Sequence, residues 1–328
     1  MEECPGTREC AAATPERTAT MSDSALHDSA GTNWRDESAR SGFSLVAVLV
    51  FMLIVSAIVV PFAVTAKTRL MIANSEVEQE RLSLLAEGLG NVVASALTGG
   101  SGGQKFSLDS TPTSCRSGEY SFTVRVQDHG GLIDLNAADD RLLELGFAAL
   151  GFEQQASAEL AKATIRFRDS AKLFADLPRS RSTVGPPEDK QAPFESVSEL
   201  QEFSALSSIP LHTLNGVFTV NSKRGTISAD RAPGRLRAAL ASGSSASVVQ
   251  AVADASAYTV DVAARRDGSG IAGEAGFIIE KSPTGAAFSR VARSPAAEAG
   301  VLPPVAGTAD CEMLFGTEAA QILRGWSS

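Results

Sequence analysis

The chain has 328 residues, of which 44% are hydrophobic and 20% are charged, and its formal net charge is −9. A chain of this length forms one or two domains of ordinary size. Its acidic balance argues against a nucleic-acid-binding protein, which needs a basic face to meet phosphates, so we expect no nucleic acid among its partners.

A polar leader precedes the only long apolar run of the chain. Residues 1–42 are rich in Ser, Thr and Ala and lack hydrophobic periodicity, so we expect them to be disordered. Residues 43–66 carry no charged side chain, and Lys67 and Arg69 follow them. Because a helix rises ~1.5 Å per residue, about 24 residues span the ~30 Å hydrocarbon core of a bilayer. The run therefore predicts one transmembrane helix.

The junction between the leader and the run reads Ser41-Gly42-Phe43-Ser44. It resembles the cleavage signal of type IV pilins and type II secretion pseudopilins. The resemblance implies that a prepilin peptidase cuts between Gly42 and Phe43 and that Phe43 is then N-methylated. An uncleaved signal anchor is the alternative. An ordinary secretory signal would need a small-residue cleavage site after the run, and residues 59–62 offer none.

The predicted helix continues beyond the membrane and ends at a glycine-rich segment, residues 99–103. Pro61 is a candidate kink. The second half is amphipathic, with apolar residues three and four positions apart. These are Leu82, Leu85, Leu89, Val92 and Ala96. We therefore expect one helix over residues 43–98, whose second half packs on a globular head or forms a plain stalk.

Alternating apolar and polar residues predict strands at residues 121–126 and 257–263, and a further strand at residues 276–280. A turn is expected at residues 267–270, which read Asp-Gly-Ser-Gly. Together with the long helix, these strands predict a small α/β head. About 100 residues that are mostly helical interrupt it.

Within the interruption, helices are predicted at residues 156–168 and 195–203, a loop at 169–192 and a strand at 218–221. Ser196 and Glu199 fit a capping box at the start of the second helix. The segment also contains an internal repeat with an offset of 94 positions. Gly131, Ile133, Asn136, Ala138, Arg141 and Leu142 correspond to Gly225, Ile227, Asp230, Ala232, Arg235 and Leu236. A duplicated strand-cap-helix unit is the preferred interpretation, and chance similarity is the alternative.

Three motifs follow the junction in order. They are Val126-Gln127-Asp128-His129-Gly130-Gly131-Leu132-Ile133-Asp134-Leu135-Asn136-Ala137-Ala138, Ile165-Arg166-Phe167-Arg168-Asp169 and Phe194-Glu195-Ser196-Val197-Ser198-Glu199-Leu200. This order resembles the general secretion pathway protein K family, the large minor pseudopilins of type II secretion systems, over about residues 42–280. The chain departs from the family in its glycine-free hairpin at residues 207–212 and in Asp230-Arg231-Ala232 of the second copy.

The resemblance implies an α+β, pilin-like fold with a large inserted α-helical domain of the SAM-like or helix-hairpin-helix-like kind. The expected boundaries are a leader at 1–42, the long helix at 43–98, an α/β head at 104–128 and 245–290, the inserted domain at 129–240, and a divergent tail at 291–328. It also implies a single-pass protein of the bacterial inner membrane with its C-terminal head in the periplasm. Basic residues at the two ends of the apolar run nearly balance and do not fix this orientation.

Position five after the implied cut is Ala47. Most pilins and pseudopilins have glutamate there, which pairs with the amino terminus of the neighbouring subunit nearer the tip. An unpaired carboxylate in hydrocarbon costs several kcal/mol, and a subunit at the tip has no neighbour to pair with it. The resemblance therefore implies a tip subunit that helps to initiate pseudopilus assembly and the export of folded periplasmic proteins. Its implied partners are the I- and J-type minor pseudopilins, the prepilin peptidase and the inner-membrane secretion platform.

Two further sets of residues are candidate sites. Some relatives bind calcium in the helical domain, which makes Asp128, Asp134, Asp139 and Asp169 candidate ligands. In an oxidising periplasm Cys115 and Cys311 form a disulfide or remain as two thiols, and the sequence leaves both open.

We expect no enzymatic activity. The sequence has no nucleophile elbow or metal-site spacing, and residues 99–103 lack the Lys-Ser/Thr of a phosphate-binding loop. The carboxylates of Asp139, Asp140 and Glu144 are better explained as a solvated helix start, where acidic residues are favourable. The alternative function is a minor pilin of a type IV pilus or DNA-uptake system, which would share the cleavage signal.

Overall fold

The computed structural model describes residues 37–99, 106–169, 185–186, 190–242, 256–282, 288–293 and 309–326. The helices are α1 (Glu37–Thr98), α2 (Asp140–Ala149), α3 (Gln154–Arg168), α4 (Leu211–Asn215), α5 (Gly234–Ser242), α6 (Cys311–Phe315) and α7 (Thr317–Trp326). Short 3-10 helices are η2 (His129–Gly131), η4 (Val197–Glu202) and η5 (Ala229–Arg231). The strands are β1 (Thr113–Ser117), β2 (Tyr120–Asp128), β3 (Ile133–Asp134), β4 (Phe218–Thr219), β5 (Ala257–Arg266), β6 (Ala272–Lys281) and β7 (Phe288–Arg293).

The chain divides into two compact units, Met1–Lys67 and Thr68–Ser328. In the first unit the described residues form the N-terminal part of α1. This helix begins at Glu37, so the last residues of the predicted disordered leader are helical. Pro61 lies inside the helix, and the Thr65 hydroxyl donates a hydrogen bond of 2.8 Å to the Pro61 carbonyl. Within the described residues, α1 is the one helix that is long and apolar enough to cross a membrane.

In the second unit a five-stranded antiparallel sheet has the strand order β1-β2-β5-β6-β7. The strands predicted at residues 121–126, 257–263 and 276–280 are confirmed as parts of β2, β5 and β6. The predicted turn joins β5 to β6, and Gly268 in it has a φ of 73°, a left-handed conformation that glycine adopts without steric cost. β2 and β5 are joined by nine residue pairs, although residues 129–256 separate them in sequence.

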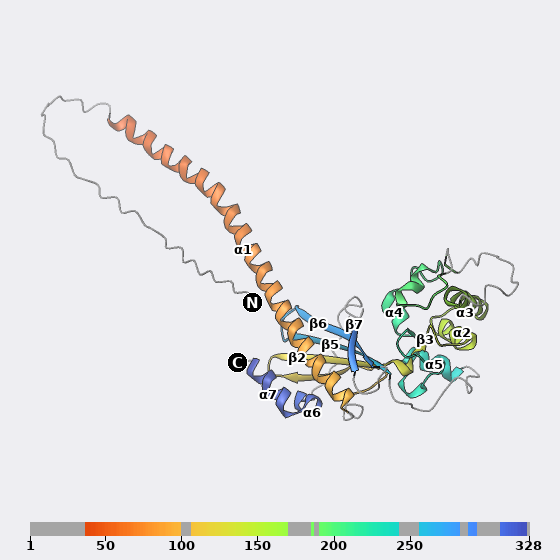
Figure 1. The fold of residues 1–328 in the computed structure, drawn as a ribbon. Coiled ribbons are helices and arrows are strands. Elements are labelled where there is room, and N and C mark those ends of the chain that lie inside the picture. Colours follow the sequence, from red (N-terminus) through yellow and green to blue (C-terminus); the bar gives the residue numbers. More distant parts are fainter. Residues whose placement is uncertain are drawn as a thin grey trace, which may run out of the picture. The chain divides into compact units, whose positions relative to one another are not determined.

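The C-terminal half of α1 packs on one face of this sheet (Figure 1). Its buried residues are Leu82, Leu85, Ala86, Leu89, Val93 and Leu97. The predicted Val92 is exposed, and Ala96 is only partly buried. The reason is helical periodicity, because steps of four residues from Leu89 keep the same face toward the sheet better than a step of three. The predicted contact is therefore confirmed for its first three leucines and wrong for the last two residues.

The C-terminal helices α6 and α7 belong to the same core as the sheet. Cys311 and Leu323 are buried in the cluster that contains Phe122 and Phe277. Strand β7 crosses the predicted boundary at residue 290. Residues 309–326 are thus part of the head and not a separate tail, because they supply apolar side chains to its hydrophobic core.

Described residues between β2 and β5 form a second hydrophobic cluster around Phe147, Phe167, Phe203 and Phe218. Its small sheet pairs β3 with β4 in parallel, and the helices α2 to α5 gather around it (Figure 1). The predicted helix at 156–168 is confirmed as α3. The predicted helix at 195–203 is the 3-10 helix η4, and the predicted strand at 218–221 is shortened to β4. Most of the predicted loop at 169–192 lies outside the described residues.

The two copies of the internal repeat contact each other reciprocally. A Cβ added to Gly131 would lie 2.0 Å from the carbonyl oxygen of Arg231, and a Cβ added to Gly225 would lie 3.0 Å from that of Ala137. Residues 137 and 231 are themselves separated by the repeat offset. The helices that follow, α2 and α5, also begin at equivalent positions. This reciprocity supports a duplicated unit rather than chance similarity.

Candidate functional site

The residues of the predicted cleavage junction all lie on α1. Gly42 and Phe43 are in its first turns, and Ala47, one turn later, is exposed. The helix passes through the junction without a break. Cleavage and N-methylation at this position remain predictions.

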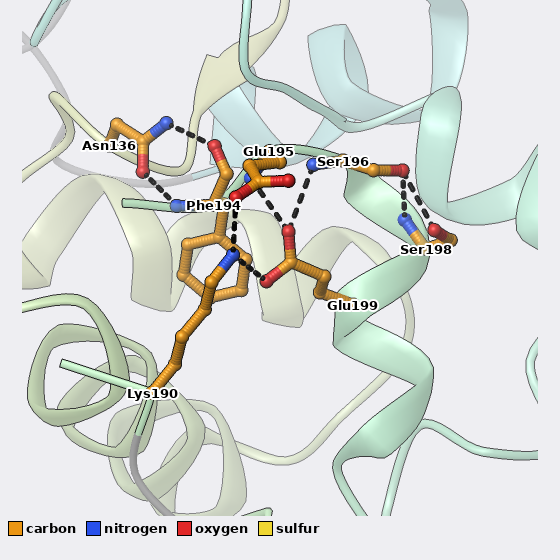
Figure 2. Close-up of polar contacts among 7 residues, drawn as sticks. All are labelled: Asn136, Lys190, Phe194, Glu195, Ser196, Ser198 and Glu199. Atoms are coloured by element: carbon orange, nitrogen blue, oxygen red, sulfur yellow. Dashed lines mark hydrogen bonds and ion pairs between the residues drawn. The ribbon is translucent and has the colours of Figure 1, made fainter. Parts of the chain in front are cut away.

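The three motifs that resemble the K family meet in the helical segment although they are far apart in sequence. The Asn136 side chain forms two hydrogen bonds with the backbone of Phe194 (Figure 2). Its amide nitrogen donates to the Phe194 carbonyl at 2.9 Å, and its amide oxygen accepts from the Phe194 N–H at 2.7 Å. The first and third motifs are thereby joined as two strands would be, by one donor and one acceptor.

The predicted capping box is confirmed, and it lies within the third motif at the start of η4. The Ser196 side chain accepts from the Ser198 N–H at 3.1 Å, and Glu199 accepts from the N–H groups of Glu195 and Ser196. Lys190 donates to the second Glu199 oxygen at 2.7 Å (Figure 2). Burial raises the pKa of Glu199, but the hydrogen bonds from Lys190 and from the two N–H groups outweigh this effect, and the pKa is lowered. Glu199 therefore stays ionised and caps the N-terminus of η4.

The second motif contributes Arg168, which is largely buried. Its guanidinium donates to the carbonyl oxygen of Leu135 and, at 2.7 Å, to that of Ala138. Both carbonyls belong to the turn between β3 and α2. A ring cluster of Phe167, Phe194 and Phe203 packs beside these contacts, with centroids 4.9 to 6.5 Å apart. The motifs thus satisfy one another's backbone groups around one turn.

A polar joint connects this segment to the five-stranded sheet. Asp128, at the end of β2, forms an ion pair with Arg231 of η5. Burial raises the pKa of Asp128, and the hydrogen bond from Gly130 and the charge of Arg231 oppose this effect. Gln127 donates to the Arg231 carbonyl at 3.0 Å.

His129 lies at the centre of the same joint and is buried. Its Nδ1 is 2.6 Å from the Thr219 hydroxyl of β4, and its Nε2 is 2.8 Å from the Thr259 hydroxyl of β5. Burial lowers the pKa of His129 to about 4, so the ring is neutral at neutral pH. A neutral imidazole has one donor and one acceptor, and a hydroxyl can serve either.

The four candidate calcium ligands have separate roles in the protein. Asp134 accepts hydrogen bonds from Asn136, Ala137, Ser222 and Lys223. Asp139 caps α2, Asp128 pairs with Arg231, and Asp169 lies 3.5 Å from the Arg168 guanidinium. Within the described residues, no three His, Cys, Asp or Glu side chains form a group that could hold a metal ion. Calcium binding at these aspartates remains a prediction.

The cysteine pair forms a disulfide that joins β1 to the start of α6. The backbone of Arg116 also bonds to Ala309 on the same side of β1. Sequence reasoning had left the pairing open, because no local pattern relates two cysteines 196 residues apart.

Sequence reasoning missed Lys190 and the joint role of His129. Lys190 lies in a segment predicted as loop, with no periodic signal. His129 was predicted only as part of the first motif, without a role of its own. Its signal is its position between a predicted strand and Gly130-Gly131, where the chain leaves the sheet.

No protein-family model and no curated protein matches the chain. One similar solved chain belongs to the GspK-GspI-GspJ complex of the type 2 secretion system of enterotoxigenic Escherichia coli. The identity is 13% and the TM-score 0.43, over 69% of this chain and 98% of that chain. A similarity of this size is too low to assign a fold or a function.

Proposed function

We propose that this chain is a minor pseudopilin of a type II secretion system, processed between Gly42 and Phe43 and anchored by one helix in the bacterial inner membrane. The observation that carries the proposal is α1. Its apolar first part follows the prepilin-like junction, and its later part is the core helix of an antiparallel sheet. This combination is what a membrane-stored subunit with a folded head requires.

The helical segment favours the K type among minor pseudopilins. The three motifs occur in the order of that family, and they contact one another through Asn136, Arg168 and Phe194. Contacts that join all three motifs support the K type more strongly than any one motif does.

We place the subunit at the tip of the pseudopilus, next to the I- and J-type minor pseudopilins. With Ala47 at position five, no carboxylate is left unpaired in hydrocarbon when the subunit has no neighbour above it. A tip subunit would help to start assembly and so support the export of folded periplasmic proteins.

Processing is the first test. Gly42→Val should leave the precursor uncut, while the wild type begins at Phe43 with an N-methyl group. Gly88→Val is the matched control, because a Cβ at this position on the same helix meets nothing within 4 Å. Intact mass and N-terminal sequencing of membrane-extracted protein are the measurements. A wild-type protein that keeps its leader contradicts the proposal.

The second test separates the two candidate systems. Co-purification from the native membrane followed by cross-linking should recover I- and J-type minor pseudopilins beside and below this subunit, and only at one end of the assembly. A minor pilin of a type IV pilus or DNA-uptake system is the alternative, since it would share the junction. Recovery of major pilin along the fibre would favour that alternative.

A further inference from the structure

Three ion pairs join the helical segment, residues 129–242, to the five-stranded sheet. Each has its carboxylate on the sheet side and its cation on the helical side. The pairs are Asp109–Arg237, Asp128–Arg231 and Glu280–Lys223. Among the described residues, the hydrophobic clusters of the two bodies have no member in common. Complementary charge therefore contributes directly to the docking of the helical segment on the sheet.

The three carboxylates lie in a row across one end of the sheet. Their partners in the strand register are Gln127 for Asp109, Tyr258 for Asp128 and Ala257 for Glu280. The row therefore runs from the residue before β1 across β2 and β5 to β6, and three strand spacings of ~4.8 Å make it roughly 14 Å long. Asp128 lies between the other two carboxylates, at the point where the chain leaves β2 for the helical segment.

The three cations lie in or beside the second copy of the internal repeat, and the first copy has no Lys or Arg at the equivalent positions. Those positions are His129 for Lys223, Ala137 for Arg231 and Leu143 for Arg237. By contrast, Arg235 of α5 corresponds to Arg141, so a cation at this position is common to both copies. The two copies are thus related in structure but differ in the charges that they present to the sheet.

The three pairs differ in their exposure to water. In the central pair the side chains of Arg231 and Asp128 are 17% and 0% exposed. In the two flanking pairs the cations are much more open, at 66% for Lys223 and 47% for Arg237. Exposed ion pairs contribute little to stability and are screened by salt, whereas a buried pair is costly to break. The flanking pairs are therefore the easier contacts to open.

Hydrogen bonds between the two bodies lie close to the central pair. Gln127 donates to the Arg231 carbonyl at 3.0 Å, and the His129 ring contacts one hydroxyl on each body, those of Thr219 and Thr259. Water can replace hydrogen bonds of this kind at a modest net cost. Polar interfaces between compact bodies of one chain commonly permit relative motion, unlike large apolar ones.

We infer that the helical segment turns as a folded body on the end of β2, with Asp128–Arg231 as the pivot and the two flanking pairs as electrostatic latches. When the latches open, both hydrophobic clusters stay folded, because neither cluster contains a residue of the other. The second repeat copy is then the docking copy, since it supplies all three cations. This motion goes beyond the proposed function and does not depend on it.

The test measures the distance between the two bodies in the full-length protein in nanodiscs. Spin labels on non-canonical amino acids at Ala148 of α2 and Gln321 of α7, both exposed, report it by double electron–electron resonance. The wild type should give one narrow distance at low salt. Lys223→Glu combined with Arg237→Glu should raise the population at other distances about tenfold, because two attractive contacts become repulsive. Salt at 1 M, where the Debye length is ~3 Å, should shift the wild type in the same direction.

Arg235→Glu is the matched control, because it makes the same change of charge on α5 at an exposed position outside the three pairs, and it should leave the distance narrow. Lys223→Glu alone should broaden the distance, and adding Glu280→Lys should narrow it again by restoring the pair with exchanged charges. A double variant that keeps the wild-type distance overturns the inference, as does an exchanged pair that does not narrow it. Equal broadening by Arg235→Glu, or loss of helical circular dichroism in the double variant, also overturns it.

Discussion

Gly273→Ala tests the contact that holds α1 on the sheet. Gly273 is on β6, and a Cβ at this position would lie 2.2 Å from the carbonyl carbon of Leu82 and from the backbone nitrogen of Ser83. Both atoms belong to the helix backbone and have no rotamer to change. The helix must therefore move away from β6, which loosens the packing of Leu82 and Leu85. Overpacking usually costs 1–3 kcal/mol, and a clash with backbone places this one at about 3 kcal/mol or more.

A loss of about 3 kcal/mol should lower the melting temperature of the head by roughly 6–12 °C, at 2–4 °C per kcal/mol for a domain of this size. Thermal unfolding of the full-length protein in detergent, followed by circular dichroism, is the assay. Gly270→Ala is the matched control, because a Cβ there meets nothing within 4 Å. A melting temperature for Gly273→Ala equal to that of the control would refute the close packing of α1 on β6.

Two further predictions concern the head and the joint. Cys115→Ser, or a reducing agent, should lower the free energy of unfolding by up to about 5 kcal/mol, the loop-closure entropy for cysteines 196 residues apart; a urea midpoint that does not respond to reductant would contradict this. His129 should make the protein less stable as the pH falls from about 6.5 to about 4, because the unfolded chain takes up a proton on this ring before the buried ring does. The loss is on the order of 3 kcal/mol, and His129→Gln should flatten this part of the pH profile of urea unfolding; an unchanged slope in the variant would count against the buried, neutral ring.

Much of the head could be predicted because its signals are local. Alternation in residues 121–126 and 257–263 reflects strands with one face on the core, and the sheet uses these residues as expected. The helix face could be predicted only in part. Leu89 lies on the buried face, but the choice between Val92 and Val93 depends on how the helix turns over the sheet, which no window of sequence contains.

The C-terminal segment shows where sequence reasoning stops. Residues 291–328 lie outside the part of the chain that resembles the K family, so we expected a divergent tail there. The place of residues 309–326 in the head depends on the Cys115–Cys311 disulfide and on Leu323, which contribute to a core built mostly by residues far upstream. Such long-range complementarity has no signature in the segment itself.

The helical segment contains both features that local sequence predicts and contacts that it does not. The repeat could be predicted from residues spaced by a fixed offset, and the capping box of η4 from Ser196 and Glu199. The partners of these residues could not, because Asn136 bonds to a backbone 58 residues away and Arg168 to carbonyls some 30 residues earlier.

The reciprocal glycines explain why the copies of the repeat act as one unit. Gly131 admits the backbone of the second copy and Gly225 admits that of the first. Each copy therefore needs the other to cover its own buried backbone, and neither presents a complete surface alone. Asn136 of the first copy forms hydrogen bonds with the backbone of Phe194 in the third motif. The ion pair of Asp128 with Arg231 joins the second copy to the end of β2. The first motif, which contains Asp128 and Gly131, thus lies where the two copies meet each other and the end of β2.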